Sequence, residues 1–397
     1  MLPENNPNIA VFSFAFSPLE GGAEIATRET SRRLKWLNFA IFTHKFNRGW
    51  LTKEVSDNIE IIRIGKGRKK EKLYCGIWTK IFYIFKAWQS AEQLHKQKRF
   101  QVIWAIMTSY GGIAALFFKL NHPRIPLLVT IQEGDSEKHL ILGKLGLVGF
   151  FGKRIIRTAN YIQVISSYLK DFAKKRGAKA RIDIIPNGVD LKVFDTQYTN
   201  EELRMVRGSL GLKDEYVVIT TSRLVYKNGI DVLISAIARC QEKMLNVKCL
   251  IIGDGPEREK LKVQSQKLKI DNKIIFLGQI PQRDLPLYLK ISDVFVRPSR
   301  SEGLGNSFLE AMAAGLPIIG TPVGGIVDFL ISNETGLYTN VDDANDLADK
   351  IHKLLTSPES RGRLINNGKK MVRENYSWDI VAKHFKNIFD TLINTHG

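Results

Sequence analysis

The sequence SRSEGLGNSFLEAMAAGLPIIGTPVGG, residues 299–325, contains the features that decide the fold and the chemistry of this chain. It follows an apolar run that ends at Arg297-Pro298, and its segment NSFLEAMAA predicts a helix that stops at Gly315. Gly303 and Gly305 would let backbone approach a ligand, and the helix start aims N–H groups and a partial positive charge at the same point. This strand, turn and helix therefore predict an anion-binding site.

Two carboxylates belong to the same stretch. Glu302 comes just before the expected helix and Glu310 about two turns into it, so both could face the mouth of the loop. A ligand with phosphates in its middle and hydroxyls at both ends, such as a nucleotide sugar, matches this arrangement. A plain glycine-rich turn without a ligand remains an alternative for the stretch taken alone.

Length and composition indicate two domains. The chain has 397 residues, of which 44% are hydrophobic, and this suffices for two ordinary cores. Cys75, Cys240 and Cys249 are widely spaced, which predicts neither a disulfide framework nor a zinc site and favours a reducing compartment. The first residues lack the basic start of a secretory signal, and no apolar run reaches about eighteen residues. We therefore expect a cytoplasmic chain without a membrane span.

The positive charge is concentrated in the first half. The net charge is +19 overall, +16 for residues 1–190 and +3 for residues 191–397. Residues 63–99 and 138–157 combine basic side chains with aromatic and aliphatic ones, which predicts contact with an anionic membrane surface. A helix that faces the core and has a solvated basic flank is the alternative. No recognised nucleic-acid module accompanies the charge, so we expect no nucleic-acid partner.

Strands and helices alternate along both halves, which predicts an α/β fold with two Rossmann-like, doubly wound parallel sheets. The expected strands of the first half lie at about 8–16, 39–43, 59–64, 102–107, 126–131 and 161–165. The alternation resumes from residue 216, after a Pro-Asn-Gly turn at which the net charge changes. The expected domains are residues 1–190 and 191–375, followed by a final helix over 376–397.

Further candidate ligand groups follow two strands of the second half. The segment SRLVYKNG places Arg223 and Lys227 four residues apart near a helix start, where two cations could clamp a diphosphate. The segment GDGPE contains Gly253 and Gly255, which permit a tight turn beside a planar base. Either motif alone could be a surface loop or a common turn. Because parallel strands end at one edge of the sheet, we expect these motifs to meet there.

In the first half, Gly21 and Gly22 occupy the turn that follows the first strand. There they could present bare N–H groups to a ligand, although a plain turn explains the pair equally well. The strand IPLLVTI is followed by Gln132 and Glu133, which are candidate acceptor-side residues.

The ordered set of motifs resembles the family 4 glycosyltransferases, which are retaining enzymes of the GT-B architecture. GGAE at 21–24, PNGVD at 186–190, SRLVYKNG at 222–229, IIGDGPE at 251–257 and the E-x7-E stretch occur in the family's order and rough spacing. The resemblance covers nearly the whole chain. It implies two facing Rossmann-like domains with an interdomain cleft, a donor held mainly by the second domain, and an acceptor on the first. It also implies that no metal ion or other cofactor is required and that the final helix packs back on the first domain.

The resemblance also assigns roles to single residues. Arg223 and Lys227 would hold the diphosphate, and Glu310 would bind the ribose hydroxyls. Glu302 would bind the transferred sugar together with the amides of Leu304 and Gly305, next to Asn306. The loop with Gly253 and Gly255 would border the base, and Gly21 and Gly22 would close over the phosphates. No residue is assigned as a carboxylate nucleophile, because the family is expected to react by a front-side mechanism.

The chain departs from the family at two positions. Gln132 stands where many members carry a histidine, and a glutamine cannot shuttle a proton at neutral pH. Asn228 stands where a glycine usually follows the lysine, and because Asn tolerates left-handed backbone we expect little effect.

We therefore expect a hexosyltransferase that uses a UDP- or GDP-sugar and a glycan or lipid-linked acceptor in surface polysaccharide or glycolipid synthesis. We expect it to be cytoplasmic and peripheral at the inner membrane face. A nucleotide-sugar epimerase or hydrolase on the same fold is one alternative. A non-catalytic nucleotide- or membrane-binding module is the other, and Gln132 is the observation in its favour.

Overall fold

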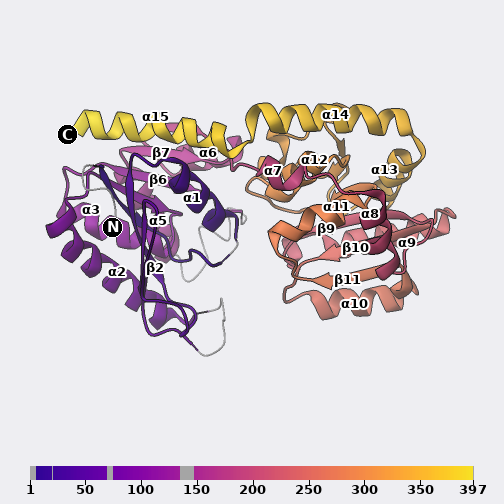
Figure 1. Cartoon of the computed structure of the whole chain (residues 1–397), viewed down its shortest axis with the longest axis horizontal. Coiled ribbons are helices and arrows are strands. Elements are labelled where there is room, and N and C mark those ends of the chain that lie inside the picture. Colours follow the sequence, from indigo (N-terminus) through magenta and orange to yellow (C-terminus); the bar gives the residue numbers. More distant parts are fainter. Residues whose placement is uncertain (1–5, 20, 69–74, 135–146, 397) are drawn as a thin grey trace. The chain divides into compact units, whose positions relative to one another are not determined.

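The computed structural model describes residues 6–19, 21–68, 75–134 and 147–396, and the chain divides into two compact units (Figure 1). The first unit consists of Met1–Asn187 together with Trp378–Gly397, and the second is Gly188–Ser377. The last segment of the chain therefore belongs to the first unit. Each unit is built around its own sheet.

The first unit contains an eight-stranded sheet of order β3-β4-β2-β1-β5-β6-β7-β8, in which only the edge pair β3–β4 is antiparallel. Its strands are β1 (Asn8–Phe12), β2 (Asn38–His44), β3 (Lys53–Ser56), β4 (Ile59–Ile64), β5 (Val102–Ile106), β6 (Leu127–Ile131), β7 (Tyr161–Val164) and β8 (Arg181–Ile184). The expected strand over 8–16 was too long, because the chain leaves the sheet at Phe12. The polar edge strand β3 was not predicted, since its sequence KEVS has no run of apolar residues.

Helices cover both faces of this sheet. They are α1 (Gly22–Arg33), α2 (Ile77–Lys98), α3 (Tyr110–Asn121), α5 (Leu147–Thr158), α6 (Ser167–Lys175) and α15 (Trp378–His396). Figure 1 shows α2 and α3 lying side by side, and these two helices are in extensive contact. In the part of the chain that the structure describes, no helix is both long enough and apolar enough to cross a membrane.

Alternation along the strands assigns side chains to the two faces. On one face, Val11 and Trp104 belong to the same buried cluster as Phe389 of α15, and the Trp104 and Phe389 rings lie 5.5 Å apart. On the other face, Phe12 packs against Phe118 of α3 with ring centroids 5.9 Å apart. The apolar stripe of the last helix is therefore part of the core of the first unit.

The second unit contains a six-stranded parallel sheet of order β11-β10-β9-β12-β13-β14. Its strands are β9 (Tyr216–Thr221), β10 (Val247–Ile252), β11 (Ile274–Gly278), β12 (Val294–Arg297), β13 (Ile318–Gly320) and β14 (Leu337–Tyr338). Here too alternation separates the faces: Val294 and Val296 join one buried cluster, whereas the Phe295 ring lies 5.1 Å from that of Phe308.

The helices of the second unit connect and cover these strands. They are α7 (Leu191–Phe194), α8 (Asn200–Ser209), α9 (Ile230–Glu242), α10 (Arg258–Lys267), α11 (Leu285–Lys290), α12 (Asn306–Ala314), α13 (Ala344–Thr356) and α14 (Pro358–Asn375). Four short 3₁₀ helices lie in loops of the described chain: η1 (Tyr226–Asn228), η2 (Asp271–Lys273), η3 (Gln282–Asp284) and η4 (Gly324–Asp328).

Both sheets have a point at which the strand order reverses. In the first sheet this point lies between β1 and β5, and in the second it lies between β9 and β12. In open parallel sheets ligands bind outside the carboxyl ends of the strands at such points. In the second unit this position is occupied by the loops that follow Thr221 and Arg297. These loops are therefore the expected ligand-binding position of the second unit.

The place of α15 in the core leads to a stability prediction. Phe389 is fully buried, so Phe389→Ala should lower the free energy of unfolding of the first unit by about 3–5 kcal/mol through lost burial and a residual cavity. Lys383→Ala, an exposed position on the same helix, is the control and should change it by less than about 0.5 kcal/mol. Denaturant unfolding followed by tryptophan fluorescence measures both. Equal effects of the two substitutions would contradict this place in the core.

Candidate functional site

The loops after β9, β10, β12 and β13 are joined by backbone hydrogen bonds. Leu224 N donates to Asp254 O at 3.0 Å, which joins the first two loops. Arg300 N donates to Lys227 O at 2.7 Å, which joins the loop after β12 to the loop after β9. Residues that are far apart in the sequence thereby form one surface at the carboxyl edge of the second sheet.

The GDGPE turn packs directly on the loop that carries Arg223. A Cβ atom on Gly253 would lie 1.9 Å from Ser222 O, and one on Gly255 would lie 2.4 Å from Leu224 O. Neither distance is possible for a side chain, so both positions require glycine. These glycines hold the neighbouring loop, and their place beside a base stays a prediction.

The two candidate phosphate ligands differ in exposure. The Arg223 side chain is exposed, whereas Lys227 lies half-buried in η1. Asn228 is buried, and its Nδ2 donates to the backbone oxygen of Arg223 at 2.7 Å. The left-handed backbone that an asparagine tolerates is not adopted at Asn228, because Gly229 takes that conformation with φ +68°. The asparagine instead fixes the backbone next to the exposed arginine.

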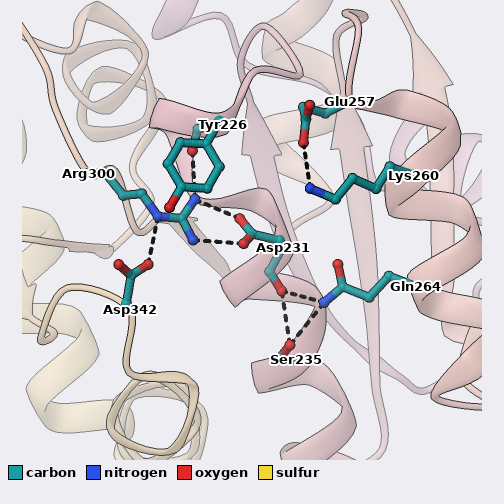
Figure 2. A network of polar contacts seen from close by, with 8 residues as sticks. All are labelled: Tyr226, Asp231, Ser235, Glu257, Lys260, Gln264, Arg300 and Asp342. Carbon is teal, nitrogen blue, oxygen red and sulfur yellow. Dashed lines mark hydrogen bonds and ion pairs between the residues drawn. The ribbon is translucent and has the colours of Figure 1, made fainter. Parts of the chain in front are cut away.

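Arg300 is the centre of a polar network that sequence analysis did not identify (Figure 2). Its guanidinium donates to both carboxylate oxygens of Asp231, at 2.9 and 2.7 Å, and to Asp342 at 2.7 Å. It also donates to Tyr226 O at 2.6 Å and lies 4.0 Å from the centre of the Tyr226 ring. Arg300 thus connects the loop bearing Lys227 to the start of α9.

The ionisation of Asp231 follows from this network. Burial alone would raise the pKa of Asp231, but the hydrogen bonds and charge of Arg300 outweigh it and lower that pKa. Asp231 therefore stays ionised beside Arg300. A signal was available in the sequence, since Arg300 lies inside the Gly-rich stretch, but nothing in the linear order indicates its distant partner.

Glu302 is held on both of its oxygens. Its Oε2 accepts from Arg297 Nη2 at 2.5 Å, and its Oε1 accepts from Gly303 N at 3.0 Å. Gly324 of the TPVGG segment packs against the backbone oxygen of the same residue. A Cβ on Gly324, which has φ +55°, would lie 1.8 Å from Glu302 O. Sequence analysis missed both Arg297 and this role of Gly324.

Glu310 lies nearer the start of its helix than expected. The helix α12 begins at Asn306, after Gly305 with φ +99°, so Glu310 is about one turn in and not two. Leu304 is buried just before this start. Glu310 Oε1 accepts from Gln282 Nε2 at 2.9 Å, and burial raises its pKa against the opposing effects of this bond and of the Arg297 charge.

The candidates of the first unit lie at the carboxyl edge of its own sheet. Gly21 precedes α1 and Gly22 begins it, and both are exposed. Glu24 folds back toward the turn, so that a Cβ on Gly21 would lie 2.1 Å from Glu24 Oε2. That oxygen is the far end of a flexible side chain and could move, so the distance does not require glycine at position 21, and the contact of Gly21 with phosphates stays a prediction.

Gln132 and Glu133 make different contacts. Gln132 Oε1 accepts from Asn187 Nδ2 of the PNGVD segment at 3.1 Å. Glu133 is buried, and its Oε1 accepts from Thr108 N at 2.7 Å and from Thr108 Oγ1 at 2.8 Å. Burial raises the pKa of Glu133. Together with Arg176 it lines a small pocket, so an acceptor contact by Glu133 would have to be made there.

Within the described ranges, no group of three or more His, Cys, Asp or Glu side chains is arranged to hold a metal ion. Whether the reaction needs a metal is not decided by this arrangement, and metal independence stays a prediction.

The contact between Gly324 and Glu302 can be tested by a glycine comparison. Gly324→Ala should destabilise the second unit by about 2 kcal/mol or more, because the methyl group meets Glu302 O and the backbone has positive φ. Gly362→Ala is the control, since nothing lies within 4 Å of its Cβ position in α14, and it should be neutral or stabilising by up to about 1 kcal/mol. Thermal unfolding compares the two. A Gly324→Ala protein as stable as the control would contradict the contact.

Comparison with known proteins agrees with the two-unit organisation. Residues 205–371 match the family model described as "Glycosyl transferases group 1", and residues 20–193 match the model described as "Glycosyltransferase Family 4". The fold is that of sucrose-phosphate synthase from Thermosynechococcus elongatus, with a TM-score of 0.84 and 23% identity over 98% of this chain and 100% of that one. This is the GT-B fold.

Several relatives carry names that describe a reaction. The GDP-mannose-dependent alpha-(1-6)-phosphatidylinositol monomannoside mannosyltransferase of Mycolicibacterium smegmatis is 30% identical over 57% of this chain, which spans only 61% of that relative. The alpha-monoglucosyldiacylglycerol synthase of Acholeplasma laidlawii is 30% identical over 76% of this chain and 72% of the relative. The family models and this second relative together show that the chain belongs to glycosyltransferase family 4.

Proposed function

We propose that this glycosyltransferase is a retaining, metal-independent hexosyltransferase that moves a hexose from a UDP- or GDP-sugar to a lipid-linked or glycan acceptor. The products would be a surface glycolipid or polysaccharide. The observation that carries the proposal is that the loops with Arg223, Lys227 and Glu302, and the helix start that contains Glu310, meet where the strand order of the second sheet reverses. Cations, carboxylates and a helix start are there available to one ligand.

The diphosphate would be held by Arg223 and Lys227. The Asn228 amide orders the backbone next to Arg223, and Arg300 orders the turn that contains Lys227. Ordering of this kind matters because charge builds on the leaving diphosphate in the transition state, and preorganised cations stabilise it without further rearrangement. The start of α12 adds N–H groups and a partial positive charge.

The two glutamates would bind the two ends of the donor. Glu310 would accept hydrogen bonds from the ribose hydroxyls, and the Gln282 amide that now donates to it would move aside or share its oxygens. Glu302, with the Leu304 and Gly305 amides, would bind the transferred hexose. Both assignments follow the order of groups in a nucleotide sugar.

The reaction would proceed on one face of the sugar. The bond between the anomeric carbon and the diphosphate oxygen breaks, a bond to the acceptor oxygen forms on the same side, and the departing phosphate oxygen takes the acceptor's proton. Glu302 is already engaged by Arg297 and Gly303, so the proposal gives it a binding role and not that of a nucleophile. Catalysis then rests on positioning and on stabilising charge at the leaving group.

A lipid-linked acceptor is supported by two observations. By their names, one of the relatives above acts on a phosphatidylinositol monomannoside, and the other synthesises an alpha-monoglucosyldiacylglycerol. In the first unit, exposed apolar side chains on α2 and α5 make up what we term the aromatic face: Ile77, Trp78, Phe82, Phe85 and Phe150. Both helices pack on α3, and Lys153, Arg154 and Arg157 are exposed on α5. Residues 69–74 and 138–146 of the two predicted membrane segments lie outside the described residues.

Donor use can be tested at the phosphate and ribose ends. Lys227→Ala and Glu310→Ala should each lower kcat/KM for the donor by at least about 100-fold, or about 3 kcal/mol, because each removes charged contacts to the bound nucleotide sugar. Lys267→Ala, exposed on α10, is the control. Activity is measured as sugar transfer from UDP- and GDP-sugars to diacylglycerol and glycan acceptors.

Three results would refute these assignments. Full activity of both variants would show the site to be wrong. Absence of transfer with any donor and acceptor, together with absence of nucleotide-induced thermal stabilisation, would show the function to be wrong. Release or isomerisation of the sugar without an acceptor would favour a hydrolase or an epimerase. A thermal-shift comparison of UDP, GDP and ADP identifies the base, since the preferred nucleotide raises the melting temperature most.

Membrane contact predicts salt-dependent binding to anionic vesicles. The protein should co-sediment with vesicles that contain phosphatidylglycerol at low salt and less at high salt, because the exposed cations act through screened attraction. Replacing Trp78 and Phe82 by Ala should weaken binding several-fold, since both insert apolar area. Met205→Ala, an exposed apolar residue of the second unit, is the control. Absence of binding at low salt would instead make these helices ordinary covering elements.

A further inference from the structure

A buried arginine is the last residue of β12, one of the two central strands of the second sheet. The strand pairs with β9 on one side and β13 on the other, and this residue, Arg297, is only 6% exposed. A guanidinium at such a depth is costly unless its N–H groups are satisfied. A buried arginine at the end of a strand therefore needs several hydrogen-bond acceptors, and these acceptors indicate its role.

The partners of Arg297 all belong to the first part of the Gly-rich stretch. Its Nε donates to Ser299 Oγ at 3.2 Å, its Nη1 to Ser307 Oγ at 2.7 Å and its Nη2 to Glu302 Oε2 at 2.5 Å. Each of its three nitrogens thus engages a different residue. A planar fork can make this set of bonds, whereas a single lysine ammonium cannot reach three separate partners in the same geometry.

The Phe308 ring and Gly305 border the Arg297 guanidinium on two sides. The centre of the Phe308 ring lies 4.8 Å below it. On another side, a Cβ on Gly305 would lie 3.2 Å from Nη2 and 2.9 Å from the Phe308 ring. The space that Gly305 leaves free is therefore the space that the arginine and the aromatic ring use. The glycine before α12 has a role in holding Arg297 as well as in bending the chain.

The consequence for Glu302 is a carboxylate of fixed orientation. One oxygen accepts from Arg297 and the other from Gly303 N, and the side chain is 16% exposed. An ionised carboxylate offers about four acceptor sites, so two of them remain for a ligand. The free sites point in directions that the two bonds have already determined. A ligand with two adjacent hydroxyls would meet acceptors that need no rearrangement.

We propose that Arg297, with Ser307, is the positioning residue for Glu302, and that it determines how strongly the hexose is bound without contributing directly to nucleotide affinity. This inference rests on the proposed function, because it takes Glu302 as the group that binds the transferred sugar. Arg297 acts through Glu302 and not on the ligand itself. Substitution of Arg297 should therefore weaken binding of the hexose without weakening binding of the nucleotide.

The experiment measures a ratio of dissociation constants on the full chain. Calorimetry gives Kd for UDP, UDP-glucose, GDP and GDP-mannose. The sugar ratio is Kd of the nucleotide divided by Kd of the corresponding nucleotide sugar. Arg297→Met should lower this ratio at least 10-fold while Kd of the nucleotide changes less than about 3-fold. Arg297→Lys should restore only part of it. Arg239→Met, an exposed arginine of α9, is the matched control and should change neither quantity.

A double substitution tests whether the effect passes through Glu302. In an E302Q background, Arg297→Met should lower the sugar ratio no further, since the oriented carboxylate is already absent. Ser307→Ala should cause a smaller loss than Arg297→Met and is expected to fold, because it removes one hydroxyl at a partly exposed position. Circular dichroism and thermal unfolding establish folding for each variant. Ser307→Ala and Arg297→Lys keep the test decisive if Arg297→Met does not fold.

The outcomes separate this inference from the proposed function. A wild-type chain that binds none of the four ligands would overturn the proposed function, and the inference with it. A wild-type chain that binds them, combined with an unchanged sugar ratio in the arginine variants, would overturn the inference alone. An equal loss of nucleotide and nucleotide-sugar affinity would also overturn it, because it indicates a structural role. A further loss in the E302Q background would show that Arg297 acts by another route.

Discussion

The site in the second unit depends on close backbone contacts between loops that end neighbouring strands. Gly253 and Gly255 pack on carbonyl oxygens of the loop after β9, and Gly324 packs on the carbonyl oxygen of Glu302. At distances of 1.8–2.4 Å from these oxygens no Cβ atom could be placed. The motifs are therefore Gly-rich for a steric reason within the protein itself, before any ligand is considered. The loops support one another as a single layer over the carboxyl edge of the sheet.

Two arginines, one at the end of β12 and one in the loop that follows it, hold the charged side chains of this layer in order. Arg297 is buried and holds Glu302, while Arg300 holds Asp231, Asp342 and the turn that contains Lys227. Both arginines form ion pairs with carboxylates of the protein. The cations proposed for the diphosphate, Arg223 and Lys227, lie on a separate loop that the second arginine orders. In the proposed site, the first pair of cations orients protein groups and the second pair binds the phosphates, which would fit a reaction that relies on preorganised charge.

Much of the fold and part of the site could be predicted from the sequence. Buried parallel strands have continuous apolar sequences, so most strands of the first sheet were located to within a few residues. The errors have physical reasons. The strand at 8–16 was too long because apolar residues also form the aromatic cluster beyond its end, where Phe14 stacks on His44. At Asn228 the tolerance of asparagine for left-handed backbone is not used, because the left-handed residue is the next one, Gly229.

The sequence by itself determined the family, the two α/β units and the stretch around Glu302 and Glu310, because glycines, apolar runs and helix limits are local signals. The tertiary structure alone decided which side chains serve these residues. Arg297 is five residues from Glu302 and Arg300 is 69 residues from Asp231, yet both make direct ion pairs. No local pattern indicates the Arg300–Asp231 pair, since it forms where strands from distant parts of the chain end at the same edge of a sheet, and the Arg297–Glu302 pair depends on how the turn between the two residues folds. Packing at that edge, and not the motif, assigns each charge its partner.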